Sequence, residues 1–181
     1  PELLGENLTQ YVDSFGGAVI FSRGRALDDE NDALAVLEPV LYAPSGTSEV
    51  QINVASGGRG LAAFQLLHDR LKTSDSLPPL IAARRAETPK TLAATLAEAE
   101  DPDTGQTTPV FVHRRFGKGQ VLNINVAGLW KWSFNSKTDV ENNIFDRFWD
   151  QLLVWLLSQS EVVPNQDYSF RTSSANILLG E

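Results

Sequence analysis

The sequence predicts an α/β domain, and three stretches of the chain carry that prediction. A helical pattern over 3–15 ends at two glycines and leads into the short apolar run 18–21. Two apolar strands separated by a glycine-containing turn form a hairpin over 109–126, and a long helix with a wide apolar face follows over 142–157. A helix, a turn and a buried strand in succession are typical of a sheet covered by helices.

The first of these stretches combines a helix with a strand. Apolar residues at helical spacing are Leu3, Leu4, Leu8, Tyr11, Val12 and Phe15. Gly16 and Gly17 follow them, and glycine readily takes the left-handed conformation that closes a helix. The run 18–21 is continuously apolar, which predicts a strand buried on both faces of a sheet.

The middle of the chain predicts smaller elements. The acidic stretch 28–32 leads into a short helix over 33–37, where acids favour the positive end of the helix dipole. The segment 49–54 alternates between polar and apolar residues, which indicates an edge or half-exposed strand, and 61–71 is an amphipathic helix. The composition of 92–97 fits a helix or a strand, and we expect a strand because a turn and a further strand follow.

The second half contains the hairpin and the long helix. Val110, Phe111 and Val112 precede the turn Phe116-Gly117-Lys118-Gly119, and an apolar strand follows it. The tip of that hairpin should expose Lys118. The segment 168–179 is polar, and we expect 164–181 to be a linker or the first strand of a following domain.

Composition excludes several classes of function. A chain of 181 residues with 42% hydrophobic residues is long enough for one core, and its net charge of −8 disfavours nucleic acid as a partner. The chain has no cysteine, which excludes disulfides, thiolate metal sites and cysteine nucleophiles. It also has no methionine and opens at Pro1, so we expect a piece of a longer product. The longest apolar stretch, 152–157, is far shorter than the ~20 residues of a membrane helix, so any anchor is expected outside this chain.

Two stretches near the C-terminal end are distinctive, Leu-Trp-Lys-Trp-Ser-Phe at 129–134 and Phe-Asp-Arg-Phe-Trp-Asp-Gln-Leu-Leu-Val-Trp-Leu at 145–156. Together with the stretches 11–17, 37–40 and 109–122, in this order and spacing, they resemble the putative glutamine amidotransferase family. The members of that family are mostly large, membrane-anchored bacterial proteins.

This resemblance implies a class I glutamine amidotransferase-like domain over 1–163. Its fold would be a flavodoxin-like three-layer α/β sandwich, with a mostly parallel sheet, a C-terminal antiparallel hairpin, and early strands supplied by sequence before Pro1. It further implies a place in the bacterial cell envelope, with membrane anchoring outside this chain. The expected partners are other domains of the same polypeptide or envelope proteins.

The enzymes of that class place a cysteine on a tight turn between a strand and a helix, with a histidine and a glutamate as partners. The equivalent turn here is Phe21-Ser22-Arg23-Gly24. Ser22 would replace the cysteine only if a histidine lay within hydrogen-bond reach. His113 is the candidate, His68 lies on the helix 61–71, and no motif places an acid to orient either ring. The simpler interpretation is that Ser22 ends the local turn.

Four residues are candidates for ligand binding. Arg23 and Arg25 follow the strand 18–21, where open α/β sheets gather ligands, but the favoured interpretation is a solvated pair that answers the acids at 28–30. Trp130 and Trp132 would point to the same side of an extended segment and form a platform for a sugar or a peptide. Core packing against Phe145, Phe148 and Trp149 of the helix 142–157 is nevertheless the favoured role.

Two further motifs are incomplete. Asp101-Pro102-Asp103-Thr104-Gly105 has the first carboxylate spacing of a calcium loop, but Val112 occupies the position of its bidentate glutamate, so a β-turn is the better interpretation. Gly57-Gly58-Arg59-Gly60 lacks the lysine and hydroxyl residue of a phosphate-binding loop, so we expect an ordinary loop. We therefore expect neither a metal nor a cofactor.

The sequence thus favours a non-catalytic structural or interaction module of an envelope protein. A hydrolase or transferase that uses Ser22 is one alternative. A small-ligand or glycan-binding domain that uses Arg23, Arg25, Trp130 and Trp132 is the other.

Overall fold

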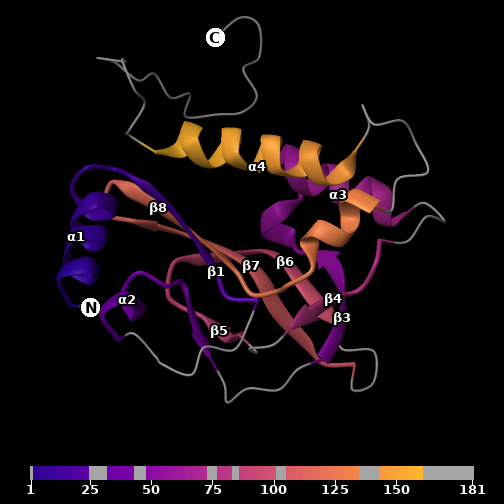
Figure 1. Cartoon of the computed structure of the whole chain (residues 1–181), viewed down its shortest axis with the longest axis horizontal. Coiled ribbons are helices and arrows are strands. Elements are labelled where there is room, and N and C mark those ends of the chain that lie inside the picture. Colours follow the sequence, from indigo (N-terminus) through magenta and orange to yellow (C-terminus); the bar gives the residue numbers. More distant parts are fainter. Residues whose placement is uncertain are drawn as a thin grey trace, which may run out of the picture.

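The computed structural model describes residues 2–24, 32–42, 48–72, 77–82, 86–100, 105–134 and 143–160. The α-helices are α1 (Glu2–Asp13), α2 (Asp32–Ala35), α3 (Ala62–Leu71) and α4 (Ile144–Gln159), and the 3-10 helices are Ser56–Gly58 and Leu129–Phe134 (Figure 1). The strands are β1 (Ala18–Ser22), β2 (Val40–Tyr42), β3 (Ser48–Val54), β4 (Leu80–Ala82), β5 (Ala86–Pro89), β6 (Ala93–Glu100), β7 (Thr107–Phe116) and β8 (Gly119–Ile124).

Six of these strands form the main sheet, in the order β1-β8-β7-β6-β3-β4. Within it only β1 and β8 run parallel, and the other four neighbouring pairs are antiparallel. The expected flavodoxin-like, mostly parallel sheet is therefore wrong. The physical reason is the short connections between β6, β7 and β8, because a tight turn can join only antiparallel strands.

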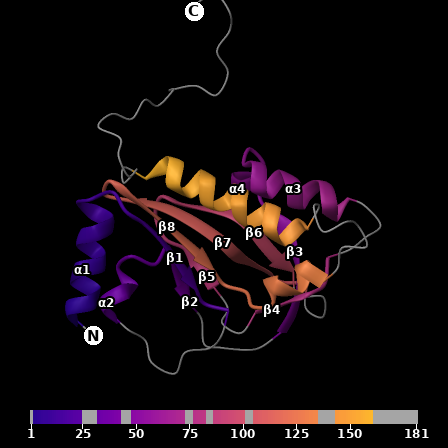
Figure 2. The same ribbon diagram turned by 45° about the horizontal axis from the view of Figure 1, so that its top comes forward.

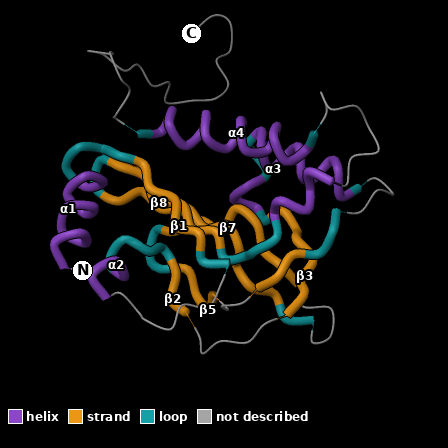
Figure 3. The backbone as a smooth tube through the Cα atoms, viewed as in Figure 1, coloured by secondary structure: helices purple, strands orange, loops and turns teal. Residues whose placement is uncertain are grey.

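Helices cover both faces of this sheet (Figure 2). α3 and α4 lie across one face. The other face is covered by α1, α2 and a second, two-stranded antiparallel sheet made of β2 and β5 (Figure 3). The central layer of the fold is therefore an antiparallel sheet, with β1 added at its edge as one parallel strand.

The core beneath α4 is aromatic. Phe148 is fully buried, and its ring makes edge-to-face contacts with Phe64, Phe111, Trp132 and Trp149, with ring centroids 5.6 to 6.1 Å apart. Such contacts add to the free energy gained by burying the rings themselves. The apolar face predicted for 142–157 is confirmed, and this face fixes α4 on the sheet.

The hairpin of β7 and β8 is confirmed, with Phe116 paired to Gly119 at its turn. Gly117 has a φ of 55°, in the left-handed region that glycine adopts without strain. The strand expected over 92–97 is confirmed as β6, and the helix expected over 61–71 as α3. The strand 49–54 keeps its alternating exposure but lies inside the sheet, between β4 and β6.

The expectation that 18–21 is buried on both faces is wrong for most of β1. Ala18, Val19 and Ile20 are only half-buried, because β1 lies at the edge of the sheet and pairs with β8 alone among the described residues. The turn expected at 101–105 lies mostly outside the described residues, and 164–181 lies entirely outside them. In the part of the chain that the structure describes, no helix is long and apolar enough to cross a membrane.

Candidate ligand-binding site

A pocket of about 470 Å³ opens where β1 and β8 end. The residues that line it are Ser22, Gly24, Val126, Ala127, Gly128, Leu129, Trp130, Phe145 and Trp149. They come from the end of β1 and the segments that follow β1 and β8, from the 3-10 helix Leu129–Phe134 and from the first turns of α4. A volume of this size falls in the range of pockets that bind small molecules.

The single parallel pair explains why the pocket lies there. Ser22 at the end of β1 pairs with Ile124 at the end of β8, so the chain leaves both strands at the same edge of the sheet. Ligands of open α/β sheets gather at such carboxyl ends. Gly24 lies directly against the segment that follows β8, since a Cβ built on it would be 2.4 Å from the carbonyl oxygen of Val126. Only glycine permits this close approach of the two walls.

The two tryptophans predicted as one platform separate. Residues 129–134 form a 3-10 helix instead of an extended segment, so Trp130 and Trp132 project in different directions. Trp132 is fully buried in the aromatic core, whereas Trp130 is 60% exposed and lines the pocket. The platform is therefore wrong for Trp132, and the favoured role of core packing against the helix 142–157 is confirmed for this residue.

The second aromatic wall comes from α4 and was expected to be core. Phe145 and Trp149 are half-buried residues of its first turns, and both line the pocket. The Nε1 atom of Trp149 is buried and has no hydrogen-bond partner among the described residues. Its accessible area is close to zero, so a ligand in the pocket would reach the ring of Trp149 but not this N–H.

The structure does not bring Ser22 and His113 together. Ser22 pairs with Ile124 on β8, and Ile124 pairs in turn with Phe111 on β7. His113 lies two residues after Phe111 on the same strand. Two strand spacings and two residues put the Cα atoms of Ser22 and His113 on the order of 12 Å apart.

The imidazole of His113 has its own partners near the other end of β8. Its Nε2 lies 2.7 Å from Oε1 of Gln120, and its ring contacts Trp155 with centroids 4.9 Å apart. Burial lowers the pKa of His113, and the hydrogen bond with Gln120 offsets part of that effect. The ring is therefore a packed, neutral residue at neutral pH. The other histidine, His68, lies in the last turn of α3.

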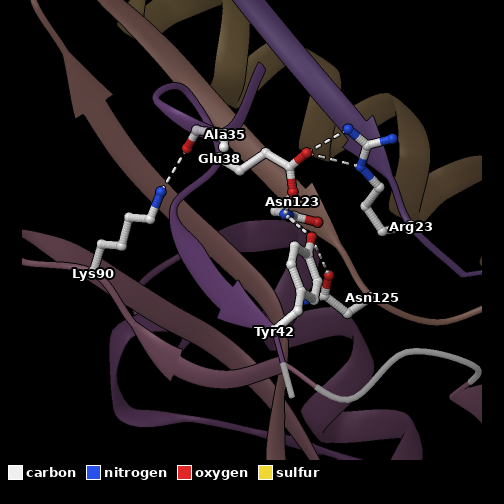
Figure 4. A network of polar contacts seen from close by, with 7 residues as sticks. All are labelled: Arg23, Ala35, Glu38, Tyr42, Lys90, Asn123 and Asn125. Carbon is white, nitrogen blue, oxygen red and sulfur yellow. Dashed lines mark hydrogen bonds and ion pairs between the residues drawn. The ribbon is translucent and has the colours of Figure 1, made fainter. Parts of the chain in front are cut away.

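Arg23 lies between two residues of the pocket, but its charge is neutralised on the opposite face of the sheet. Its Nε and Nη2 atoms both donate to Oε1 of Glu38, the former at 3.0 Å (Figure 4). Glu38 is almost completely buried, and the guanidinium also lies 5.2 Å from the ring centroid of Phe21. Arg23 thus anchors the chain after β1 rather than presenting a free charge. Arg25 lies outside the described residues.

Glu38 belongs to a polar network that the sequence did not predict (Figure 4). The Nδ2 atom of Asn123 donates to the Tyr42 hydroxyl at 2.6 Å and lies 3.5 Å from Oε2 of Glu38. The Tyr42 hydroxyl donates to Oδ1 of Asn125 at 3.2 Å. Burial, followed by the nearby Glu38 carboxylate, raises the pKa of Tyr42. The network joins β2 and the segment before it to the end of β8, directly beneath the pocket edge of the sheet.

Lys90, directly after β5, connects the two-stranded sheet to α2. Nζ of Lys90 donates to the carbonyl oxygen of Ala35 at 2.5 Å. Burial and the neighbouring Arg114 lower the pKa of Lys90. Within the described ranges, no group of three or more histidine, cysteine or acidic side chains could hold a metal ion.

Comparisons with known proteins leave the family open. No family model matches the chain, and no curated protein does. Solved structures similar to it include β-galactosidases from Rahnella sp. and from the Antarctic haloarchaeon Halorubrum lacusprofundi, with TM-scores of 0.49 and 0.47 over 84% and 83% of this chain. Another is an exo-β-1,4-mannosidase from an Opitutaceae bacterium, with a TM-score of 0.38 over 86% of this chain.

All three similarities are distant, at 15% sequence identity. The chain spans about a fifth of the length of these proteins, which are 20 to 21% covered. Their names are those of glycoside hydrolases, and the resemblance to the glutamine amidotransferase family remains a prediction. The TM-scores are all below 0.5, so the activity of these enzymes does not extend to this chain.

Proposed function

We propose that the domain binds a small, neutral carbohydrate in the pocket between β1, β8 and α4. The observation that carries this proposal is Trp130, a tryptophan that is 60% exposed and forms part of the pocket wall. Sugars present apolar ring faces, which pack against an indole, together with hydroxyl groups that need hydrogen-bond partners. The pocket offers both kinds of contact, since the exposed Ser22 lies beside the aromatic surface of Trp130, Phe145 and Trp149.

The charges around the pocket favour a neutral ligand. None of its nine lining residues is ionisable. Two cations are sequence neighbours of lining residues: Arg23 is engaged by Glu38, and the ammonium group of Lys131 lies 3.4 Å from the carbonyl oxygen of Pro79. An anionic ligand would find no ionisable side chain in the lining itself, and the one ammonium group that the described residues show beside it is that of Lys131, 3.8 Å from the Cβ position of Gly128.

The interaction module expected from the sequence is the second candidate, and the outer face of α4 favours it. Leu153, Val154 and Leu157 are 40%, 68% and 55% exposed there. Contiguous exposed apolar side chains of this kind can mark contact sites for other proteins. The envelope location and the envelope partners remain predictions.

Isothermal titration calorimetry with neutral oligosaccharides tests the sugar proposal. The probes are gluco-, galacto-, manno- and xylo-oligosaccharides of two to four units, titrated into the chain and into Trp130→Ala. We expect one series to bind, and Trp130→Ala to weaken that binding at least about tenfold, which corresponds to ~1.4 kcal/mol. Leu157→Ala, which removes a comparably exposed apolar side chain outside the pocket lining, is the matched control and should bind like the unmodified chain.

The proposal fails if no series binds, or if Trp130→Ala and Leu157→Ala bind equally well. In either case the exposed face of α4 becomes the stronger candidate, and the search moves to protein partners.

A further inference from the structure

Trp130 is one half of an exposed aromatic corner that extends beyond the pocket. The other half is Phe134, at the end of the same 3-10 helix. The two ring centroids are 5.9 Å apart and the ring planes meet at 85°. Phe134 is 81% exposed and is not among the residues that line the pocket. The aromatic surface therefore continues from the pocket wall onto the open surface.

The packing of the 3-10 helix does not require this exposure. Leu129 and Trp132 are its buried residues, and they attach the helix to the core. Trp130 and Phe134 lie on its outer side, where polar residues would be equally compatible with the packing. Single exposed apolar residues are ordinary, but two large rings in contact beside a pocket form a continuous apolar surface.

We propose that the site binds a soluble glycan chain of at least two sugar units rather than a single sugar. One unit occupies the pocket against Trp130, and the next unit leaves the pocket and packs against Phe134. This inference rests on the proposed sugar-binding function and adds to it the class of ligand and a second binding position outside the pocket.

The angle between the rings further restricts the ligand. Two ring planes at 85° cannot both lie flat against one planar ribbon or crystal face. Successive units of a free, twisted chain can meet them one after the other. The ligand is therefore a free chain in solution and not the surface of a crystalline polysaccharide.

A chain-length series tests the second position. Methyl glycosides and oligosaccharides of two, three and four units, from the series that binds, are titrated into the unmodified chain, Phe134→Ala and Phe134→Tyr. We expect the affinity of the unmodified chain to rise about tenfold between one and three units. Phe134→Ala should remove most of that rise while leaving the affinity for the methyl glycoside unchanged, and Phe134→Tyr should restore it. Because Phe134 is 81% exposed, neither change is expected to disturb folding.

The outcomes separate this inference from the proposed function. Binding that depends on Trp130 but has the same affinity at every length, or the same rise in Phe134→Ala, overturns the second position and leaves the pocket intact. Absence of binding at every length overturns both. Sedimentation with crystalline cellulose and chitin provides a further test, because Phe134-dependent pelleting with either polymer would contradict the free-chain ligand.

Discussion

Replacing Glu38 with alanine should destabilise the domain strongly, because it leaves the largely buried guanidinium of Arg23 without its partner. The Glu38 side chain is 8% exposed and the Arg23 side chain is 15% exposed, and two nitrogens of Arg23 donate to the same carboxylate oxygen. Removing one partner of such a pair costs about 3–5 kcal/mol, since the remaining charge keeps its desolvation penalty without compensation. This is a large part of the ~5–15 kcal/mol that stabilises a typical domain.

The double variant Arg23→Met/Glu38→Leu provides the control. With both charges replaced by apolar groups of similar size, no buried charge is left unpaired, and the loss should fall to about 1 kcal/mol or less. Urea unfolding followed by tryptophan fluorescence gives the free energies by linear extrapolation. The single variants Glu38→Leu and Arg23→Met complete the double-mutant cycle, and the double variant should lose much less unfolding free energy than the sum of the two single variants. If the double variant is as unstable as the sum of the single variants, the pair does not act as a unit and this reasoning is refuted.

Three further predictions follow from the same contacts. Because burial holds the pKa of His113 below its usual value, its stabilising contribution is present above about pH 6.5 and is lost as the pH falls through the lowered pKa. His113→Gln should therefore flatten the decline of unfolding free energy between pH 7.5 and 5, and an unchanged decline contradicts the assignment. Tyr42→Phe removes the hydroxyl between Asn123 and Asn125 and should lower the free energy of unfolding in urea by about 1–3 kcal/mol. An unchanged value would mean that the two amides find other hydrogen-bond partners. Gly24→Ala places a methyl group 2.4 Å from the Val126 carbonyl oxygen, so we expect a loss of ~1–3 kcal/mol in unfolding free energy together with weaker sugar binding. If stability and binding both stay at the values of the unmodified chain, the segment at Val126 moves aside and the close packing is not required.

Local patterns predicted local structure well. The period of apolar residues located α3 and α4, and the turn at Gly117 fixed the hairpin of β7 and β8, because neighbouring residues determine these features. The pairing of distant strands was predicted wrongly. A continuous apolar run such as 18–21 fits a central parallel strand or an edge strand beside a covering helix, and only the other strands decide between them.

The site was predicted in part for similar reasons. Ser22 and Trp130 were named from the sequence and line the pocket, but Trp132 turned inward because the backbone is helical where extended geometry was assumed. The polar network of Glu38, Tyr42, Asn123 and Asn125 was not predicted, although the sequence contains a signal for it. Asn123 and Asn125 alternate with Leu122, Ile124 and Val126, and amides at every second position of an otherwise apolar segment indicate buried polar partners.

The most direct test of the sugar pocket is the set of indole N–H signals in a ¹H–¹⁵N correlation spectrum. The chain has four tryptophans, so four signals are expected, each assigned by a single Trp→Phe variant. Saturation with the oligosaccharide that binds should shift the signals of Trp130 and Trp149, which line the pocket, and leave those of Trp132 and Trp155 nearly unchanged. If no oligosaccharide moves the signals of Trp130 and Trp149, the pocket is not a carbohydrate site.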